Sequence, residues 1–279
     1  MDHLTELVPI HSPRESPIVE IVLVHGLDGD PYATWGLGNN DSWTLWIASH
    51  FPRARIWSVR YRLRWSWWYG GSIPLTDRAV TTLGTLDGEL RGSEIPIVFL
   101  CHSYGGLLVK QMLRSGHDRR LEYGQLVERF KGIVFFGTPH NGASIATFVS
   151  RLGSVLRSSP AISELKRNAS LLRDLSSWFT NNAQFHAWKI RVFFETMNTF
   201  GVRVVDDDGN PHIPNVTPIA IDADHFAIGP RGFASQRKTR MQGWLGRRAN
   251  CGFLTRTAVR ATRAPNRDAP AAVRCQRRS

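Results

Sequence analysis

The chain has 279 residues, 42% of them hydrophobic, which is enough to bury the core of one α/β domain. Its longest apolar runs, IVEIVLV and IPIVFLC, are far shorter than the roughly 18 residues that suggest a membrane span. The N-terminal segment has neither the basic start nor the long apolar stretch of a secretory signal, and three cysteines do not make a disulfide framework. We therefore expect an intracellular protein that is not secreted.

The excess positive charge lies at the C-terminal end. The chain carries 35 Lys and Arg against 23 Asp and Glu, a net charge of +12. Residues 231–279 hold 13 of the basic residues and one acid, so the first 230 residues are neutral. This tail has few large apolar residues and no periodicity, which predicts disorder. We favour a solvated tail over a nucleic-acid-binding arm.

The first 230 residues alternate strand and helix patterns. In chain order, the sequence predicts a strand at 18–24, a helix at 43–50, a strand at 55–60, a helix at 76–91, a strand at 95–100, a helix at 106–114, a strand at 132–136, helical segments between 162 and 179, and strands at 189–194 and 216–221. Continuous apolar strands separated by helices indicate a mostly parallel sheet covered on both faces, an α/β fold. We expect this domain to span residues 18–230, after a lead-in of residues 1–17.

Residues 97–106 read IVFLCHSYGG, an apolar strand that ends in a polar pair and two glycines. In a strand–turn–helix elbow, the nucleophile occupies the tight turn, and small residues two places before and after it allow close packing. Cys101 and Gly105 hold these places around Ser103, with Cys101 where the usual pattern has glycine. Gly106 further allows tight packing of helix on sheet. We interpret Ser103 as a nucleophile.

A serine hydroxyl needs a base that accepts its proton. His225 follows the last predicted strand, in PIAIDADHFAI, and lies downstream of Ser103. This placement fits the order nucleophile, acid, histidine. We therefore prefer His225 to the two other candidates, His140 and His102. We expect Asp222 and Asp224 only to flank His225.

The acid that orients the histidine should follow the penultimate strand. Glu195 ends that strand and is our first choice, while Asp208 and Asp206 in VVDDDG are the alternatives. Backbone N–H groups of Leu27 and Tyr104 are the expected oxyanion hole, because such donors come from the loop after the first core strand and from the residue after the nucleophile. No phosphate-binding glycine loop or zinc-ligand spacing is found, so we expect no cofactor and no metal.

Five motifs occur in the order LVHGLDGDPYATW, CHSYGG, FFGTPHNGAS, FFET and ADHFAI. In this order the chain resembles the lipase-type α/β-hydrolases of the serine active site-containing protein family and, more distantly, the GPI inositol-deacylases. The resemblance covers roughly residues 18–230. It implies an α/β-hydrolase fold, acyl-ester or lipid chemistry, and Ser103 and His225 in the catalytic places, and it leaves the acid undecided. It also implies a cytoplasmic location or an association with mitochondrial or endoplasmic reticulum membranes.

Residues 60–71, RYRLRWSWWYGG, combine aromatic and basic side chains. Such a segment suits contact with a membrane interface or an acyl chain, and ordinary packing of a long loop is the alternative. Together the patterns predict a serine hydrolase that cleaves a carboxylic ester, of a lipid by resemblance, through an acyl-enzyme on Ser103. The alternative is a non-catalytic, hydrolase-derived signalling or recruitment module.

Overall fold

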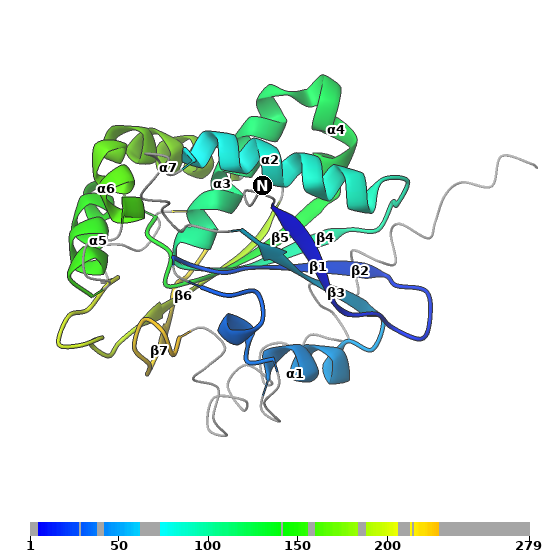
Figure 1. The fold of residues 1–279 in the computed structure, drawn as a ribbon, viewed down its shortest axis with the longest axis horizontal. Coiled ribbons are helices and arrows are strands. Elements are labelled where there is room, and N and C mark those ends of the chain that lie inside the picture. The colour runs from blue at the N-terminus through cyan, green and yellow to red at the C-terminus, as the bar shows by residue number, and fades with distance from the viewer. Residues whose placement is uncertain are drawn as a thin grey trace, which may run out of the picture.

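The structure is a computed structural model that describes residues 5–27, 29–37, 42–61, 73–140, 142–155, 160–183, 188–205, 213 and 215–228. Seven strands form one sheet in the order β1-β3-β2-β4-β5-β6-β7 (Figure 1). The strands are β1 (Glu6–His11), β2 (Val19–Val24), β3 (Ala54–Arg60), β4 (Ile97–His102), β5 (Phe130–Phe136), β6 (Lys189–Glu195) and β7 (Ile219–Ile221). All neighbouring strands are parallel except β1, which pairs antiparallel with β3. The predicted α/β architecture with a mostly parallel sheet is confirmed.

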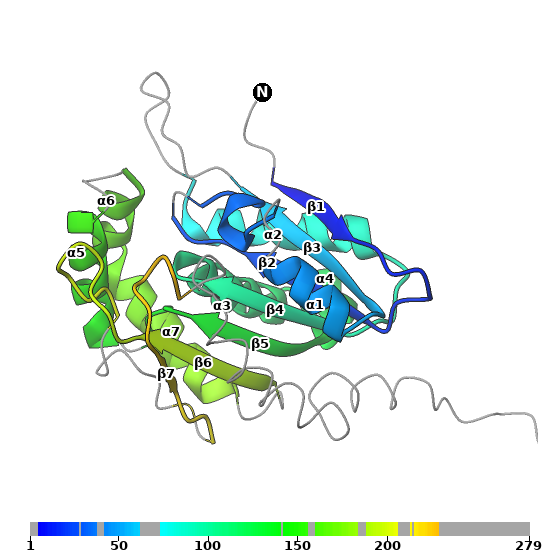
Figure 2. The ribbon, with the colours of Figure 1, turned by 90° about the horizontal axis from the view of Figure 1, so that it is seen from below.

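Helices cover both faces of the sheet. They are α1 (Trp43–His50), α2 (Leu75–Leu90), α3 (Tyr104–Asp118), α4 (Arg120–Glu128), α5 (Gly142–Val155), α6 (Pro160–Arg167) and α7 (Ala169–Ala183), with a short 3₁₀ helix at Ala33–Trp35. Figure 1 shows α1 below the sheet and α2, α3, α4 and α7 above it. Seen from below in Figure 2, α1 crosses in front of the strands, while α5 and α6 lie at one end beside α7.

Two apolar cores result from this layering, one on each face. The strands supply both cores because successive side chains of a strand point to opposite faces. In β2, for example, Val22 and Val24 join the core under α2 and α3, whereas Ile21 and Leu23 join the core over α1. This explains why β2 reads as a continuous apolar run rather than as an alternating one.

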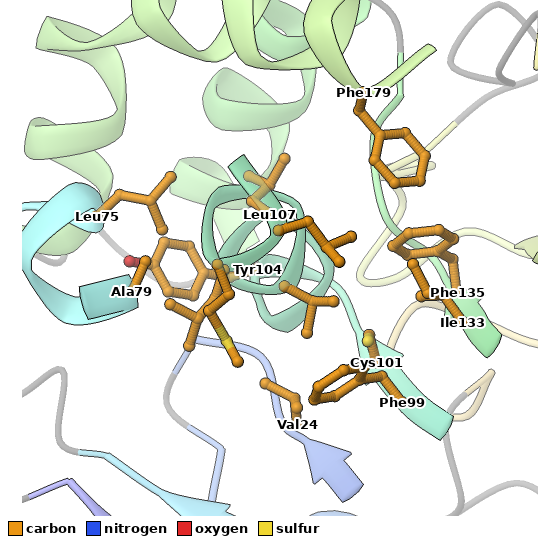
Figure 3. Packing of buried hydrophobic residues seen from close by; sticks show 14 of the residues in the cluster. Val24, Leu75, Ala79, Phe99, Cys101, Tyr104, Leu107, Ile133, Phe135 and Phe179 are labelled. Carbon is orange, nitrogen blue, oxygen red and sulfur yellow. The ribbon is translucent and has the colours of Figure 1, made fainter. Parts of the chain in front are cut away.

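Helix α3 is the central helix of the larger core. Figure 3 shows Tyr104 and Leu107 at its start, beside Leu75 of α2 and above Val24 and Cys101 of the sheet. All five side chains are buried. The start of α3 is therefore fixed by apolar contacts on several sides.

The structure departs from the predicted elements mainly at the ends of the sheet. Strand β1 lies within the segment 1–17 that we expected to precede the domain, and it contains Pro9. An edge strand tolerates proline, and the register of β1 shifts between Pro9 and His11. The strand predicted at 216–221 is only Ile219–Ile221, because Pro218 before it cannot donate to the ladder. Helices α4 and α5 were not predicted. The domain boundaries themselves stay predictions.

Helix α3 places a lysine side chain in the core. The side chain of Lys110 is fully buried, and its Nζ donates to the carbonyl oxygen of Pro139 at 3.1 Å. The rings of Phe135 and Phe179 lie 5.7 and 5.3 Å from this ammonium group. Burial lowers the pKa of Lys110 from 10.5 to about 7, while Cys101 nearby acts weakly in the opposite direction. The folded chain therefore holds a lysine that loses its proton near neutral pH.

This buried lysine should make stability depend on pH. Between about pH 7 and pH 10.5 the folded state binds fewer protons at Lys110 than the unfolded state, so the wild-type chain gains stability as the pH rises. We expect Lys110→Met to stabilise the fold at pH 6.5 by about 1–4 kcal/mol, and this gain to shrink towards pH 10. Urea unfolding at several pH values measures it. Lys131→Met, at an exposed position of β5, is the control. A less stable Lys110→Met variant at pH 6.5 would contradict the prediction.

Candidate active site

Ser103 lies in the turn between β4 and α3. Its backbone has φ 53 and ψ −122, in the left-handed region that a residue with a side chain rarely adopts. Hydrogen bonds from the end of β5 hold both of its backbone groups: Ser103 N–H donates to Phe136 O at 2.8 Å, and Thr138 Oγ1 donates to Ser103 O at 3.0 Å. The strained turn is thus fixed by the neighbouring strand.

Two glycines after Ser103 allow α3 to begin directly against the sheet. A Cβ on Gly105 would lie 2.4 Å from the carbonyl oxygen of Val24, and one on Gly106 would lie 2.3 Å from Thr138 Oγ1. Neither contact leaves room for a side chain. Cys101, where glycine is usual, is accommodated instead in the apolar core, as Figure 3 shows.

His225 and Glu195 complete a hydrogen-bonded series with Ser103. His225 Nδ1 lies 2.9 Å from Glu195 Oε1, and His225 Nε2 lies 2.9 Å from Ser103 Oγ. Since a carboxylate only accepts, Nδ1 carries the imidazole proton and the neutral ring accepts the Ser103 hydroxyl proton at Nε2. Ser103 is 2% exposed and His225 is 0% exposed. The predicted nucleophile, base and first-choice acid therefore meet at the carboxyl ends of the strands.

Glu195 is held as a carboxylate inside the protein. Burial alone would raise its pKa, but the His225 ring opposite it and hydrogen bonds from His225 and from Val205 N–H outweigh burial and lower the pKa. Gly137, with φ 55, lies against this pair, because a Cβ there would come within 3.1 Å of Glu195 Oε2 and of the His225 ring. The alternative acids Asp206 and Asp208 lie outside the described residues.

The two rival histidines have other positions. His102 Nε2 donates to the backbone oxygen of His225 at 2.8 Å, so it contacts the main chain of the histidine that faces Ser103. His140 is buried with its ring 4.7 Å from Phe135, and neither ring nitrogen has a hydrogen-bond partner among the described residues. Burial, and to a lesser extent Lys110, lower the pKa of His140 well below its usual value, so it is neutral. Asp224 accepts backbone N–H groups from Phe226 and Ala227, a role in the turn.

The loop after β2 packs directly against Ser103. A Cβ on Gly26 would lie 2.9 Å from Ser103 Cβ. The Gly26 carbonyl oxygen accepts from His25 Nδ1 at 2.9 Å and from Gly29 N–H at 3.2 Å. Because the peptide bond is trans, the N–H of Leu27 in the same peptide unit points in the opposite direction. The orientation of Leu27 N–H is thus fixed through the carbonyl of Gly26.

The ring of His25 is held in place by an aromatic ring that stacks on it. Its ring stacks on Tyr61 at a centroid distance of 4.2 Å, and the Tyr61 hydroxyl donates to the His25 carbonyl. Burial lowers the pKa of His25 to about 4, which the hydrogen bond to Gly26 only partly offsets. Near neutral pH the ring is therefore uncharged and donates from Nδ1. His25 precedes Gly26 in the motif LVHGLDGDPYATW, but this motif does not predict the stacking of His25 on Tyr61.

Comparison with solved structures gives the class of fold. The mature lipase BlEst2 of Bacillus licheniformis matches 84% of this chain and 94% of its own, with a TM-score of 0.55 and 15% identity. A lipase-esterase related protein of Clostridium acetobutylicum matches 88% of this chain and 99% of its own, with a TM-score of 0.50 and 8% identity. Together with the sheet order, these likenesses show that the chain has the α/β-hydrolase fold, as the motifs implied.

The comparison by sequence leads to particular proteins. The chain is 29% identical over 204 residues to Protein SERAC1 of Danio rerio and 27% identical over 202 residues to Protein SERAC1 of Homo sapiens. Each alignment covers 65% of this chain and 31% of the relative, so the matched part spans less than a third of those proteins. The resemblance to serine active site-containing proteins is thereby confirmed. No family model matches the chain.

Two further findings concern the described part of the chain. Within the described ranges, no group of three His, Cys, Asp or Glu side chains is arranged to hold a metal ion. Among the helices that the structure describes, none combines the length and the apolar character needed to cross a membrane.

The choice of acid can be tested by paired substitutions. We expect Glu195→Gln to lower kcat for an ester by about 10³–10⁴-fold, because an amide cannot hold the imidazole in the required tautomer and stabilise its charged form. Asp208→Asn, the matched control, should change kcat by less than about threefold. Steady-state kinetics and circular dichroism of each folded variant give the answer. A severe loss in Asp208→Asn with a mild one in Glu195→Gln would reverse our ranking.

Proposed function

We propose that this chain is a serine hydrolase that cleaves carboxylic esters through an acyl-enzyme on Ser103. The observation that carries the proposal is the buried series Ser103 Oγ, His225, Glu195, with both contacts at 2.9 Å. A nucleophile, a base and a group that orients the base are the parts that acyl transfer requires. The fold and the similarity to serine active site-containing proteins support the same reaction class.

In the proposed reaction, Ser103 Oγ attacks the ester carbonyl carbon while its proton moves to His225 Nε2. The carboxylate of Glu195 stabilises the imidazolium that forms. Collapse of the tetrahedral intermediate breaks the bond to the alcohol, which leaves with the proton from His225. Water then attacks the acyl-enzyme, with His225 again as base, and releases the acid and free Ser103.

The negative oxygen of the tetrahedral intermediate would be stabilised by backbone N–H groups. Two observations support Leu27 and Tyr104 as the donors: His25 fixes the Leu27 peptide through the Gly26 carbonyl, and Tyr104 lies at the N-terminus of α3, where the helix dipole favours negative charge. Losing one such donor typically costs about 2.7–4 kcal/mol of transition-state stabilisation. Fixed donors need no rearrangement when the charge develops.

The substrate we propose is an ester with an apolar acyl or alkyl group, such as a lipid. Rings of Phe148 and Phe226 lie 6.1 and 6.0 Å from the His225 ring, so the surroundings of the base are aromatic. Aromatic side chains favour contact with an apolar part of a substrate, because both apolar surfaces are removed from water when they meet. Peripheral membrane contact through residues 60–71 and the tail, and a cytoplasmic, mitochondrial or reticular location, stay part of the proposal. Residues 62–71 and 231–279 lie outside the described residues.

One observation favours the non-catalytic alternative. Ser103 is 2% exposed, so an enzyme would need an opening through which its substrate reaches this side chain. A hydrolase-derived recruitment module would need no such opening. The two functions differ in whether Ser103 reacts with an acylating or phosphonylating reagent.

A fluorophosphonate probe decides between these functions. We expect the wild-type chain to be labelled and to hydrolyse a short p-nitrophenyl ester, because the probe reports a serine activated by a base. Ser103→Ala should abolish both. Ser115→Ala, at another buried serine of α3, should keep both and is the matched control. A folded wild-type chain that ignores the probe and a panel of esters would establish the non-catalytic alternative.

The proposed membrane contact can be tested by removing the tail. A chain that ends at residue 229 should keep its turnover of a soluble ester, since no candidate site residue lies beyond His225. It should bind anionic vesicles more weakly and with a smaller dependence on salt, because the excess charge has been removed. Vesicle co-sedimentation at two salt concentrations measures this. Unchanged binding would exclude the tail as the contact.

A further inference from the structure

The main chain of His225 is hydrogen-bonded on both sides by side chains from other parts of the fold. Its N–H donates to Thr199 Oγ1 at 2.8 Å, and its carbonyl oxygen accepts from His102 Nε2 at 2.8 Å. Both partner side chains are buried. Neither belongs to the series that connects Ser103 with Glu195.

The position of His225 in the sheet explains why such support is needed. It follows β7, which is a strand of three residues that, among the described strands, pairs with β6 alone. Ser103, by contrast, follows β4, which pairs with strands on both sides. The ladder with β6 ends at Ile221, so His225 lies beyond the strand pairing. The segment after β7 is held by contacts with the neighbouring loop, such as the hydrogen bond from Met197 N–H to Ala223 O at 3.0 Å.

Thr199 is presented by a tight turn with a strained residue. Thr199 and Val202 exchange two backbone hydrogen bonds of 2.7 and 3.0 Å around Phe200 and Gly201, whose φ values are 47 and 82. Asparagine and glycine are the residues that favour two successive left-handed positions. Phe200 has no such preference, and its side chain is 81% exposed. Strain of this kind persists where the surroundings require the conformation, and here the turn points Thr199 Oγ1 at His225 N–H.

His102 connects the same histidine with the nucleophile and with the loop after β2. It precedes Ser103 in the chain, and its Nδ1 would lie 3.0 Å from a Cβ on Gly26. Since a carbonyl only accepts, Nε2 carries the proton that bonds to His225 O. Burial, and secondarily His225, lower the pKa of His102 to about 3, so the ring stays a neutral donor over the working pH range.

We infer that Thr199 and His102 are positioning residues that hold the main chain of His225 from both sides and keep its imidazole between Ser103 and Glu195. The expected change in turnover rests on the proposed function. The expected change in the position of the imidazole does not depend on that function. The substrate does not contact either residue in this role, so the expected defect lies in kcat rather than in KM.

The Thr199 contact is tested by removing and restoring one hydroxyl group. Thr199→Val should lower kcat for an ester by about 10–100-fold and leave KM within about twofold, because small displacements of a reacting group are costly. Thr199→Ser keeps the hydroxyl and should recover most of kcat. Thr196→Val is the matched control: it loses a hydroxyl that bonds to Ile221 O in the same region but does not contact His225. Wild-type kcat in Thr199→Val would overturn the inference for this residue.

The His102 contact is tested in the same way. His102→Leu removes the donor, whereas His102→Gln keeps an N–H donor near the place of Nε2. We expect fluorophosphonate labelling to slow by about 10–100-fold in the leucine variant and to recover in the glutamine variant. Equal labelling rates in the two variants and the wild type would overturn the inference for His102. Equal losses in both, at unchanged thermal stability, would also contradict a role as hydrogen-bond donor.

A spectroscopic measurement separates this inference from the proposed function. The proton between His225 Nδ1 and Glu195 should give a low-field resonance in the NMR spectrum of the full chain, and Glu195→Gln assigns it. We expect the resonance to shift or broaden in Thr199→Val and His102→Leu, and to be retained in Thr199→Ser and Thr196→Val. If the resonance changes in these variants as expected but the wild-type chain turns over no ester, the proposed function fails and the positioning role stands. An unchanged resonance in both variants, at any activity, overturns the positioning role.

Discussion

The geometry of the site depends on the strained backbone of Ser103. A residue with a side chain stays at positive φ only where neighbouring groups hold it there. The end of β5 does this through Phe136 O and the Thr138 hydroxyl, which bond to the two backbone groups of Ser103. Close contact of α3 with β2 adds a second restraint, because Gly105 leaves no space between them. The hydroxyl therefore projects towards His225 from a main chain that is fixed by two parallel strands and a helix.

Burial keeps the neighbouring histidines of the site neutral, so the carboxylate of Glu195 faces the imidazole of His225. Removal from water lowers the pKa of His25, His102 and His140, so all three are neutral near pH 7. Glu195 contacts none of them by a hydrogen bond of its own and bonds to His225 instead. A charge that develops on His225 during acyl transfer would thus meet a carboxylate and no competing cation on these neighbouring rings. The low-dielectric surroundings strengthen that interaction.

The sequence allowed prediction of the features that local patterns encode. The central strands could be predicted because they are continuous apolar runs. Ser103, His225 and Glu195 could be predicted because each lies at or after the end of a strand, in the order typical of serine hydrolases. Contacts between distant positions could not be predicted in this way. His102 and His225 are 123 positions apart, and no periodicity or motif links a side chain to the backbone oxygen it bonds. Residues 206–208, which include the alternative acids, lie outside the described residues.

The positions of positive φ show that the fold supports the nucleophile and the base in different ways. Among the described residues, positive φ in a residue other than glycine occurs at Ser103, Phe200 and Asn215, and the first two lie in turns that contact the hydrogen-bonded series. Ser103 is strained on a strand that is paired on both sides, and the sheet itself supplies its restraint. His225 does not have a positive φ, but it follows a short edge strand, and the positive φ lies in Phe200 of the neighbouring turn. The fold therefore stabilises the nucleophile through hydrogen bonds to the backbone of Ser103 itself. It stabilises the base through side chains of Thr199 and His102 that bond to the main chain of His225, so residues beyond the series carry part of its geometry.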